Sequence, residues 1–400
     1  MLLYLLACGA EPDDTAPPDA DADADADTDT DADGDSDTDT DADTDADTDT
    51  DTTLAPGWSQ VAEAADERSV DVAVGPDGTV WVTWVYDGAV WVRRTGEDGA
   101  WEEALPLESS GTPGVAMARR PYVATDGQRA AVVFNDLTTG VVYVHTSPAD
   151  RMAFQPLVEL TGADDATFND FPKPVFVDGL LAVVWQTYTP LGWLAIARDT
   201  TDWEVENIDD WAPGLPCECC PLDGLASSGG DLFVAFRNND DDLREHWVLR
   251  LPAGGTPTAG AQASDTEGEI LYCPMEGPRL AQLRTSVLMT WADATGDNRV
   301  WISRSDDLGA SWSNENDVLG TTGLSSPTIA ASSSNTLWVT GERDAATLIA
   351  SSTDNGNTFT DAETLASPAG DLGYGQVESG GGITVVAGTA GGGVWIDRLE

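Results

Sequence analysis

The chain has 400 residues and a formal net charge of −53, from 71 acidic against 18 basic residues. This balance argues against nucleic acid and anionic membrane surfaces as partners, because both need a basic face on the protein. Hydrophobic residues make up 41% of the chain, which is typical of a protein with a buried core.

The N-terminus is short and apolar. Residues 1–7 read MLLYLLA and are followed by Cys8. The segment Leu5–Cys8 resembles a bacterial lipobox, in which the signal peptidase cuts before a cysteine that becomes lipidated. We therefore expect residues 1–8 to be a signal segment, with Cys8 carrying a lipid anchor as the only membrane attachment. The resemblance implies an extracytoplasmic protein held on a bacterial membrane, at the outer membrane or cell surface. The alternative is an accidental apolar N-terminus.

Residues 9–53 form a low-complexity segment with Asp at nearly every second position. From Glu11 to Thr53 there are nineteen Asp and one Glu, and no Lys or Arg. Such a segment cannot bury a core and repels itself, so it predicts an extended tether. Asp29-x-Asp31-x-Asp33-Gly34 matches the opening of a calcium-binding loop, but its twelfth position is Thr40 instead of Glu. We expect no specific metal site here and no cofactor elsewhere.

Residues 54–400 repeat at roughly 50 residues, a length typical of propeller blades. The second strand of each unit is the clearest, as a short apolar run of a strand buried on both faces. The seven copies are Thr79–Val85, Ala130–Asn135, Leu180–Trp185, Asp231–Phe236, Ser286–Trp291, Thr336–Thr340 and Ile383–Ala387. The sequence thus predicts an all-β propeller, with seven four-stranded blades as the first choice and six as the alternative.

The ends of the repeat region predict how the ring closes. The seventh unit stops after three strands at the C-terminus, whereas Trp58–Ala64 reads as an outer strand without a unit of its own. We expect this N-terminal strand to complete the last blade, because that leaves no broken edge between first and last blades.

Two turns in the fifth and sixth units share one pattern. Its members are Ser305, Asp307, Gly309 and Trp312 in one copy, and Ser352, Asp354, Gly356 and Phe359 in the other, with the aspartates 47 residues apart. The carboxylate can accept backbone N–H groups inside the turn, while Gly supplies φ > 0 and the aromatic packs between sheets. The pattern resembles the Asp-box, or BNR repeat, of the sialidase-like β-propellers. That family has six blades in its sialidases and carries the box on the face away from the active site.

The loops that enter the first strand of each blade share one face with those joining second and third strands. The entry loops of the middle blades are long, and extra length on a rim is where function usually lies. Two of them carry four of the five cysteines, namely Cys217, Cys219, Cys220 and Cys273. An even number in an exported protein favours disulfides, with metal binding or free thiols as alternatives. C-x-C-C-P followed by C-P-x-x-G-P also resembles a group of bacterial sialidase-like proteins.

The resemblance implies which chemistry to look for. A sialidase needs three arginines that clamp the sugar carboxylate, a Tyr–Glu nucleophile pair and an Asp acid/base. The candidate catalytic residues here are Arg120, Arg237, Arg343, Asp170, Glu276 and Tyr374. The candidate ligand-binding residues are Arg244, Trp211, Tyr188 and Tyr272. For each arginine the alternative is a salt bridge in a very acidic protein, and for each aromatic it is loop anchoring.

The sequence therefore predicts a propeller that recognises a ligand, most plausibly a glycan, on the rim of its middle blades. One alternative is an exo-acting glycosidase of sialidase type, which requires at least three arginines to converge in one pocket. Another is a docking scaffold for a surface protein, without catalysis.

Overall fold

We analysed a computed structural model of the protein. The structure describes residues 57–400 apart from 97, 109–110, 115–118, 161–167, 189–192, 209–214, 218, 254–255, 266–267, 271–274, 295 and 314. The lipobox, the Asp-rich segment, Trp211, Tyr272 and Cys273 thus lie outside the described residues, as do the side chains of Phe168 and Tyr188.

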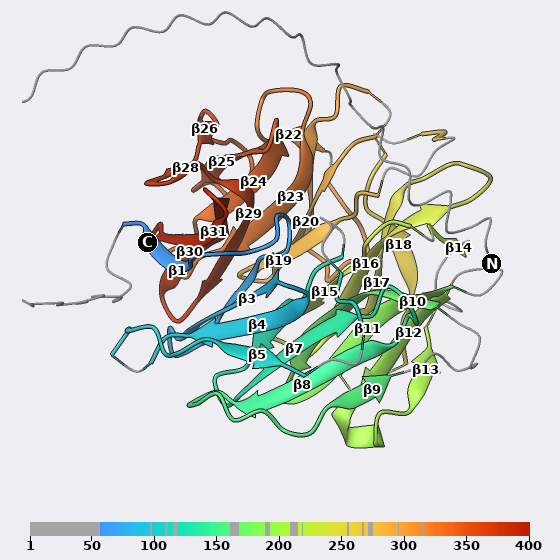
Figure 1. Ribbon diagram of the computed structural model, residues 1–400. Helices are drawn as coiled ribbons and strands as arrows, with labels where there is room; N and C mark the ends of the chain where they lie inside the picture. Colours follow the sequence, from blue (N-terminus) through green and yellow to red (C-terminus); the bar gives the residue numbers. More distant parts are fainter. Residues whose placement is uncertain are drawn as a thin grey trace, which may run out of the picture. The chain divides into compact units, whose positions relative to one another are not determined.

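The described part consists of seven four-stranded antiparallel sheets arranged as the blades of a β-propeller (Figure 1). The innermost strands are β2 (Asp71–Val74), β6 (Tyr122–Thr125), β10 (Phe168–Val177), β15 (Asp223–Ala226), β19 (Arg279–Leu283), β23 (Ser325–Ala331) and β29 (Gly373–Gly380). The second strands are β3 (Val80–Tyr86), β7 (Arg129–Asn135), β11 (Leu180–Tyr188), β16 (Leu232–Asn239), β20 (Ser286–Ala292), β24 (Leu337–Arg343) and β30 (Ile383–Ala390).

The two outer positions of each blade are filled in the same order. The third strands are β4 (Ala89–Arg94), β8 (Val142–Pro148), β12 (Trp193–Arg198), β17 (His246–Leu251), β21 (Val300–Ser305), β25 (Ala346–Ser352) and β31 (Gly393–Arg398). The outermost strands are β5 (Leu105–Leu107), β9 (Val158–Leu160), β13 (Val205–Asn207), β18 (Thr258–Gln262), β22 (Asn316–Asp317), β26 (Glu363–Thr364) and β1 (Ser59–Ala62).

The remaining elements are small. β14 (Leu215–Pro216) adds a short strand beside β16, and β27 (Ala366–Ser367) pairs with β28 (Gly370–Asp371). The single helical turn among the described residues is η1 (Asp199–Thr201). No helix in this part of the chain is long and apolar enough to cross a membrane.

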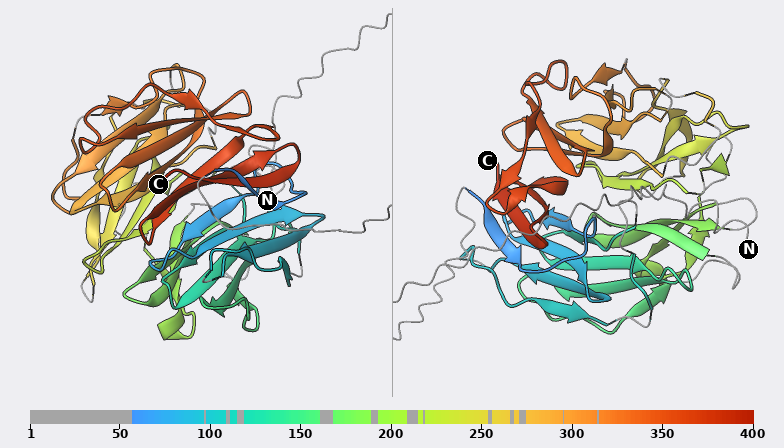
Figure 2. Two further views of the ribbon diagram at one scale, coloured as in Figure 1. Left: turned by 90° about the vertical axis from the view of Figure 1, so that its left-hand side faces the viewer. Right: turned by 45° about the horizontal axis from the view of Figure 1, so that its top comes forward.

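The ring closes as the sequence predicts. The N-terminal strand β1 pairs antiparallel with β31, so the seventh blade combines both ends of the described chain (Figures 1 and 2). The innermost strands contact one another in cyclic order, with β29 also touching β2. Seven blades, and not six, are therefore present.

Several predicted outer strands are longer than the observed ones. The sequence predicts outer strands from the aromatic residue onward, as in Trp312–Leu319, but only Asn316–Asp317 pair with β21. Trp312 instead packs half-buried against the core between blades four and five, before the strand begins. The sequence around Thr256–Ala263 carries only a weak strand pattern, yet β18 has five residues there.

Apolar side chains between neighbouring blades form the core. Each second strand is buried along nearly its whole length, with Trp81, Trp185 and Trp291 completely buried between sheets. Hydrogen bonds between innermost strands also link neighbouring blades. In each, a side chain on one innermost strand accepts a backbone N–H from the next blade. Asp71 accepts from Val123 at 3.0 Å, and Asp223 accepts from Leu280 at 2.8 Å.

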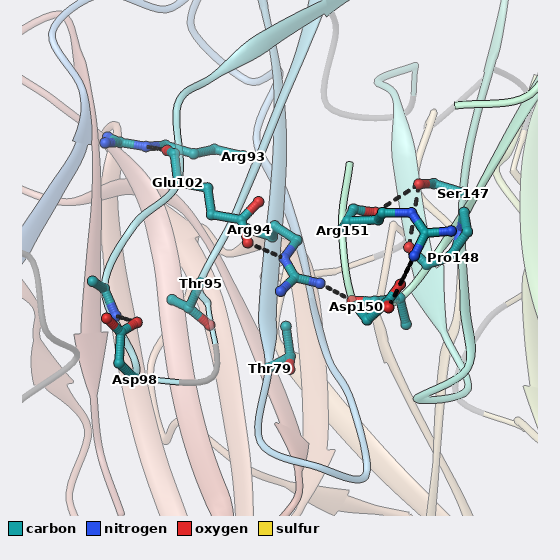
Figure 3. A network of polar contacts seen from close by, with 12 residues as sticks. Thr79, Arg93, Arg94, Thr95, Asp98, Glu102, Ser147, Pro148, Asp150 and Arg151 are labelled. Atoms are coloured by element: carbon teal, nitrogen blue, oxygen red, sulfur yellow. Dashed lines mark hydrogen bonds and ion pairs between the residues drawn. The ribbon is translucent and has the colours of Figure 1, made fainter. Parts of the chain in front are cut away.

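Polar contacts also join blades one and two. They lie near the ends of the third strands of these two blades. Arg94 donates to Glu102 of its own blade at 3.0 Å (Figure 3). It also donates to the carbonyl of Ala149 in the next blade. The guanidinium carbon lies 5.5 Å from the centre of the Trp81 ring. A buried arginine is thus paired and stacked, which satisfies its charge inside the blade interface.

Candidate functional site

The chain enters each innermost strand on one face of the propeller, and backbone strain gathers there. Five residues that are not glycine have a left-handed backbone just before or at the start of an innermost strand: Arg68, Phe171, Met275, Ser326 and Tyr374, with φ between 47° and 64°. In β10, β23 and β29 this residue lies in a bulge of the strand pairing. Such conformations cost energy and tend to occur at functional sites.

Glu276 lies in this region among several arginines. Its Oε2 accepts the Ser326 N–H at 2.8 Å. Burial raises the pKa of Glu276, and the Ser326 N–H, Arg279, Arg237 and Arg68 oppose the rise. Three guanidinium groups from three different blades therefore act on one carboxyl group.

Tyr374 and Glu342 form a second group beside the same arginine. Glu342 Oε2 accepts the Tyr374 N–H at 2.8 Å, and the Arg68 guanidinium lies 4.9 Å from the centre of the Tyr374 ring. Glu342 Oε1 is buried and has no hydrogen-bond partner in the part of the chain that the structure describes. Burial raises the pKa of Glu342, so this carboxyl group favours the protonated form more than an exposed one does.

Residues at or near the innermost strands pair opposite charges beside the central channel. Arg120 Nε lies 3.4 Å from Asp71 Oδ1, and Lys173 Nζ lies 3.2 Å from Asp223 Oδ1. Lys173 Nζ is also 3.8 Å from the centre of the Tyr122 ring. We call Asp71, Arg120, Tyr122, Lys173, Asp223 and Arg279 the collar.

The channel itself has a volume of about 330 Å³ and is lined by the innermost strands of all seven blades. Glu378 of β29 faces it, open to water yet surrounded by protein. This enclosure, together with the carboxylates of Asp71 and Asp223, raises the pKa of Glu378 to about 8, against the effect of Lys173. Arg279 interacts with Asp71 and Asp223 as well as with Glu276, and so links the collar to the groups above it.

The term mouth is used here for the collar together with five further residues: Arg68, Arg237, Glu276, Glu342 and Tyr374. The mouth holds cations beside carboxyl groups, and burial raises the pKa of three of these, Asp71, Glu276 and Glu342. Such an arrangement can receive a carboxylate from a ligand, because guanidinium groups bind carboxylates through paired N–H donors.

The structure brings together some of the predicted catalytic residues and separates others. Arg237 and Glu276 meet, since Arg237 Nε lies 3.3 Å from the Glu276 carbonyl oxygen, although Arg237 is completely buried. Arg343 instead donates to Thr321 Oγ1 at 2.7 Å on the edge of blade six. Arg120 is buried against Asp71. The expected trio of Arg120, Arg237 and Arg343 therefore does not converge in the described structure.

Asp170 lies apart from the mouth groups, in the seam between blades two and three. Its Oδ2 accepts Arg119 Nε at 2.7 Å, and its Oδ1 accepts Asn135 Nδ2 at 3.1 Å. Burial raises its pKa, which Arg119 opposes. These contacts are those of a buried ion pair that holds two blades together.

The cysteine loop lies next to Arg237. Cys217 and Cys220 are free thiols with their Sγ atoms 2.8 Å apart, so the disulfides expected for these two residues are not formed. Cys219 is disulfide-bonded. The three sulfurs lie within 4.8 Å of one another, but a disulfide sulfur is not the thiolate that a metal ion requires. Arg244 is a predicted ligand-binding residue, but its Nη1 lies 3.0 Å from Cys217 Sγ, so its guanidinium contacts a cysteine side chain.

Sequence reasoning missed Arg68, Glu342 and every residue of the collar except Arg120. A weak signal existed, because Arg68, Lys173 and Arg279 each lie at or just before an innermost strand, where a propeller turns side chains toward its axis. What the sequence does not reveal is which of seven such positions point to a common centre.

No family model matches the sequence, and no curated protein does. Among solved structures, the chain is similar to the Hadza microbial sialidase Hz136, with 16% identity, a TM-score of 0.52, and coverage of 81% of this chain and 74% of that one. An ulvan lyase of a polysaccharide lyase family, bound to -[GlcA(1-4)Rha3S]-, gives 9% identity, a TM-score of 0.53, and coverage of 86% and 94%. The polysaccharide lyase Uly1 has 10% identity and a TM-score of 0.51, with coverage of 87% of this chain and 92% of that one. At these identities the likeness shows a common fold.

Proposed function

We propose that the mouth binds a carboxylate-bearing sugar of a glycan. The observation that carries this proposal is that Arg68, Arg237 and Arg279 all act electrostatically on the Glu276 carboxyl group, in a chain with a net charge of −53. An acidic surface repels anions, so a local group of cations at the end of a channel is selective for an anion that can enter it. Proteins of similar fold include a sialidase and polysaccharide lyases, which supports a glycan as the ligand.

The proposed contacts follow from the positions of the arginines. Arg68 is half-buried at the mouth, whereas Arg237 and Arg279 are buried. Arg68 is therefore the group that would touch the sugar carboxylate, with the two buried arginines supplying positive potential behind it. The buried Tyr374 ring lies under the Arg68 guanidinium and would hold this arginine in place for the sugar carboxylate.

A glycan array tests the proposal, with pairs of glycans that differ only in having a carboxylated or a neutral terminal sugar. We expect the purified protein to retain carboxylated members and to leave their neutral partners unbound. Arg68→Ala should abolish this preference, whereas Arg151→Ala should not, because Arg151 is exposed and pairs only locally with Asp150. Equal binding of both members of each pair would contradict a carboxylate site.

One observation favours a second function, hydrolysis of the sialidase type. Tyr374, Glu342 and Arg68 lie together at the mouth, and a tyrosine beside a carboxyl group is a known alternative to a carboxylate nucleophile. If the chain is such an enzyme, it should release sialic acid from a mixed sialoglycan pool, and Tyr374→Phe should reduce that release at least 100-fold. Binding without release would leave recognition as the function, and neither activity would favour a docking scaffold.

We also propose that Cys8 is lipidated and that residues 9–53 hold the propeller away from a bacterial membrane. The support is the lipobox-like sequence and the run of Asp residues. Radiolabelled palmitate should label the full chain in a bacterial host, and Cys8→Ala should remove the label and release the protein from the membrane fraction. Membrane association that survives Cys8→Ala would contradict the proposal.

A further inference from the structure

The entry loop of blade four holds two thiols that the proposed function does not use. Cys217 and Cys220 are both completely buried, in the spacing C-x-x-C. Their Sγ atoms are 2.8 Å apart, which leaves less than 1 Å of movement before the ~2.05 Å of a disulfide bond. Bond formation would therefore need only a small adjustment of side chains.

The backbone holds the pair in this position from both ends. The Cys220 N–H donates to the Cys217 carbonyl at 3.2 Å, which holds the two cysteines close together. The Cys217 N–H donates to the Arg237 carbonyl at 2.8 Å, which ties the turn to the end of β16. Cys219, between them, is already disulfide-bonded, so it is not a thiol partner for either.

The environment treats the two sulfurs differently. The contact with Cys220 lowers the pKa of Cys217 to about 7, helped by Arg244 and Arg237 against the effect of burial. Arg244 makes direct contact, with Nη1 3.0 Å from Cys217 Sγ. Burial raises the pKa of Cys220, and the neighbouring Cys217 raises it further. The Arg244 contact thus favours the thiolate on Cys217 over Cys220, and a thiol with a lowered pKa is the attacking member of redox-active dithiols.

We propose that Cys217 and Cys220 form a reversible dithiol–disulfide pair that exchanges with low-molecular-weight disulfides. The Cys217 thiolate attacks one sulfur of the small disulfide, which breaks its S–S bond and releases one thiolate. Cys220 then loses its proton and attacks Cys217 Sγ, which releases the second thiolate and forms the Cys217–Cys220 bond. Two protein thiols are oxidised, and one small disulfide is reduced to two thiols.

The first test is a redox titration of the full chain in glutathione buffers, with alkylation and mass spectrometry of each cysteine. We expect Cys217 and Cys220 to lose alkylation together as the buffer becomes more oxidising, and to regain it together on reduction. Cys220→Ser should trap a mixed disulfide of glutathione on Cys217, whereas Cys217→Ser should leave Cys220 unmodified. Thiols that stay alkylatable in every buffer would overturn the proposal, as would a disulfide from either residue to Cys219.

The second test measures the rate of Cys217 alkylation against pH. In the reduced wild-type chain the midpoint should lie near 7, and Arg244→Met should move it upward by about one pH unit because the guanidinium no longer stabilises the thiolate. Arg244→Lys, which keeps a positive charge, should bring the midpoint most of the way back to the wild-type value. Arg250→Met is the matched control, since Arg250 lies in β17, six residues after Arg244, but pairs with Asp231. An unchanged midpoint in Arg244→Met, or a soft metal ion held stoichiometrically by the purified chain, would overturn the proposed redox pair.

Discussion

At the scale of single residues, the two turns around Asp307 and Asp354 show how a short pattern specifies a conformation. In both turns the aspartate accepts the N–H and the hydroxyl of the residue four positions later, at 2.6 to 2.9 Å. The first serine accepts the glycine N–H, and the glycines Gly309 and Gly356 have φ of 82°. The side-chain oxygens of the turn thus accept backbone N–H groups that would otherwise lack an acceptor.

Gly356→Ala should destabilise the protein by about 1 to 3 kcal/mol, as judged by chemical denaturation. The added Cβ would meet a left-handed backbone and would lie 3.3 Å from Leu337 Cδ1. Gly382→Ala is the matched control, because Gly382 has φ of 81° with open space around it. A loss no larger in Gly356→Ala than in Gly382→Ala would show that crowding in the blade interface contributes nothing.

The raised pKa of Glu378 predicts how the free energy of unfolding depends on pH. Its pKa in the folded protein, about 8, lies above the ordinary value of 4.5, so the folded state binds this proton more tightly than the unfolded state does. The resulting stability is complete below about pH 4.5 and is lost as the pH rises to about 8. Glu378→Gln should therefore flatten the decline in the free energy of unfolding between pH 5 and 8. A decline of unchanged slope in the variant would contradict the assignment.

At the scale of elements, the strand pattern could be read from the sequence, but the site could not. The seven apolar runs predicted all seven second strands, and the orphan segment Trp58–Ala64 predicted the closing strand β1. These features are local, because a strand buried on both faces needs consecutive apolar residues. The mouth is not local. Arg68, Glu276 and Glu342 come from three separate blades, and only the ring geometry brings them together.

The closing strand gives a prediction at this scale. Val61 of β1 is buried in the core between blades one and seven, and its neighbour Gln60 is exposed. Val61→Asp should place an unpaired carboxyl group in that core and cost at least 3 kcal/mol of unfolding free energy. Gln60→Asp should cost well under 1 kcal/mol. Equal stability of the two variants in thermal denaturation would show that β1 does not hold the ring closed.

At the scale of the whole molecule, charge is distributed in a way that matches the proposed function. The chain is strongly acidic overall, yet Arg68, Arg120, Lys173, Arg237 and Arg279 gather at one end of the channel. Carboxyl groups accompany them: burial raises the pKa of Asp71, Glu276 and Glu342, and enclosure in the channel raises that of Glu378. A carboxylate ligand would then compete with these groups for the same cations, so its binding should weaken as the pH rises and they ionise.

The most direct test of the account is isothermal titration of a carboxylated sugar from the array into the wild-type protein, Arg68→Ala and Arg151→Ala. Loss of a charge-assisted contact costs about 1.5 to 3 kcal/mol, so Arg68→Ala should weaken binding by roughly 10- to 100-fold. Arg151→Ala should bind as the wild type does. Wild-type affinity in Arg68→Ala, with the protein folded by circular dichroism, would contradict a glycan site at the mouth.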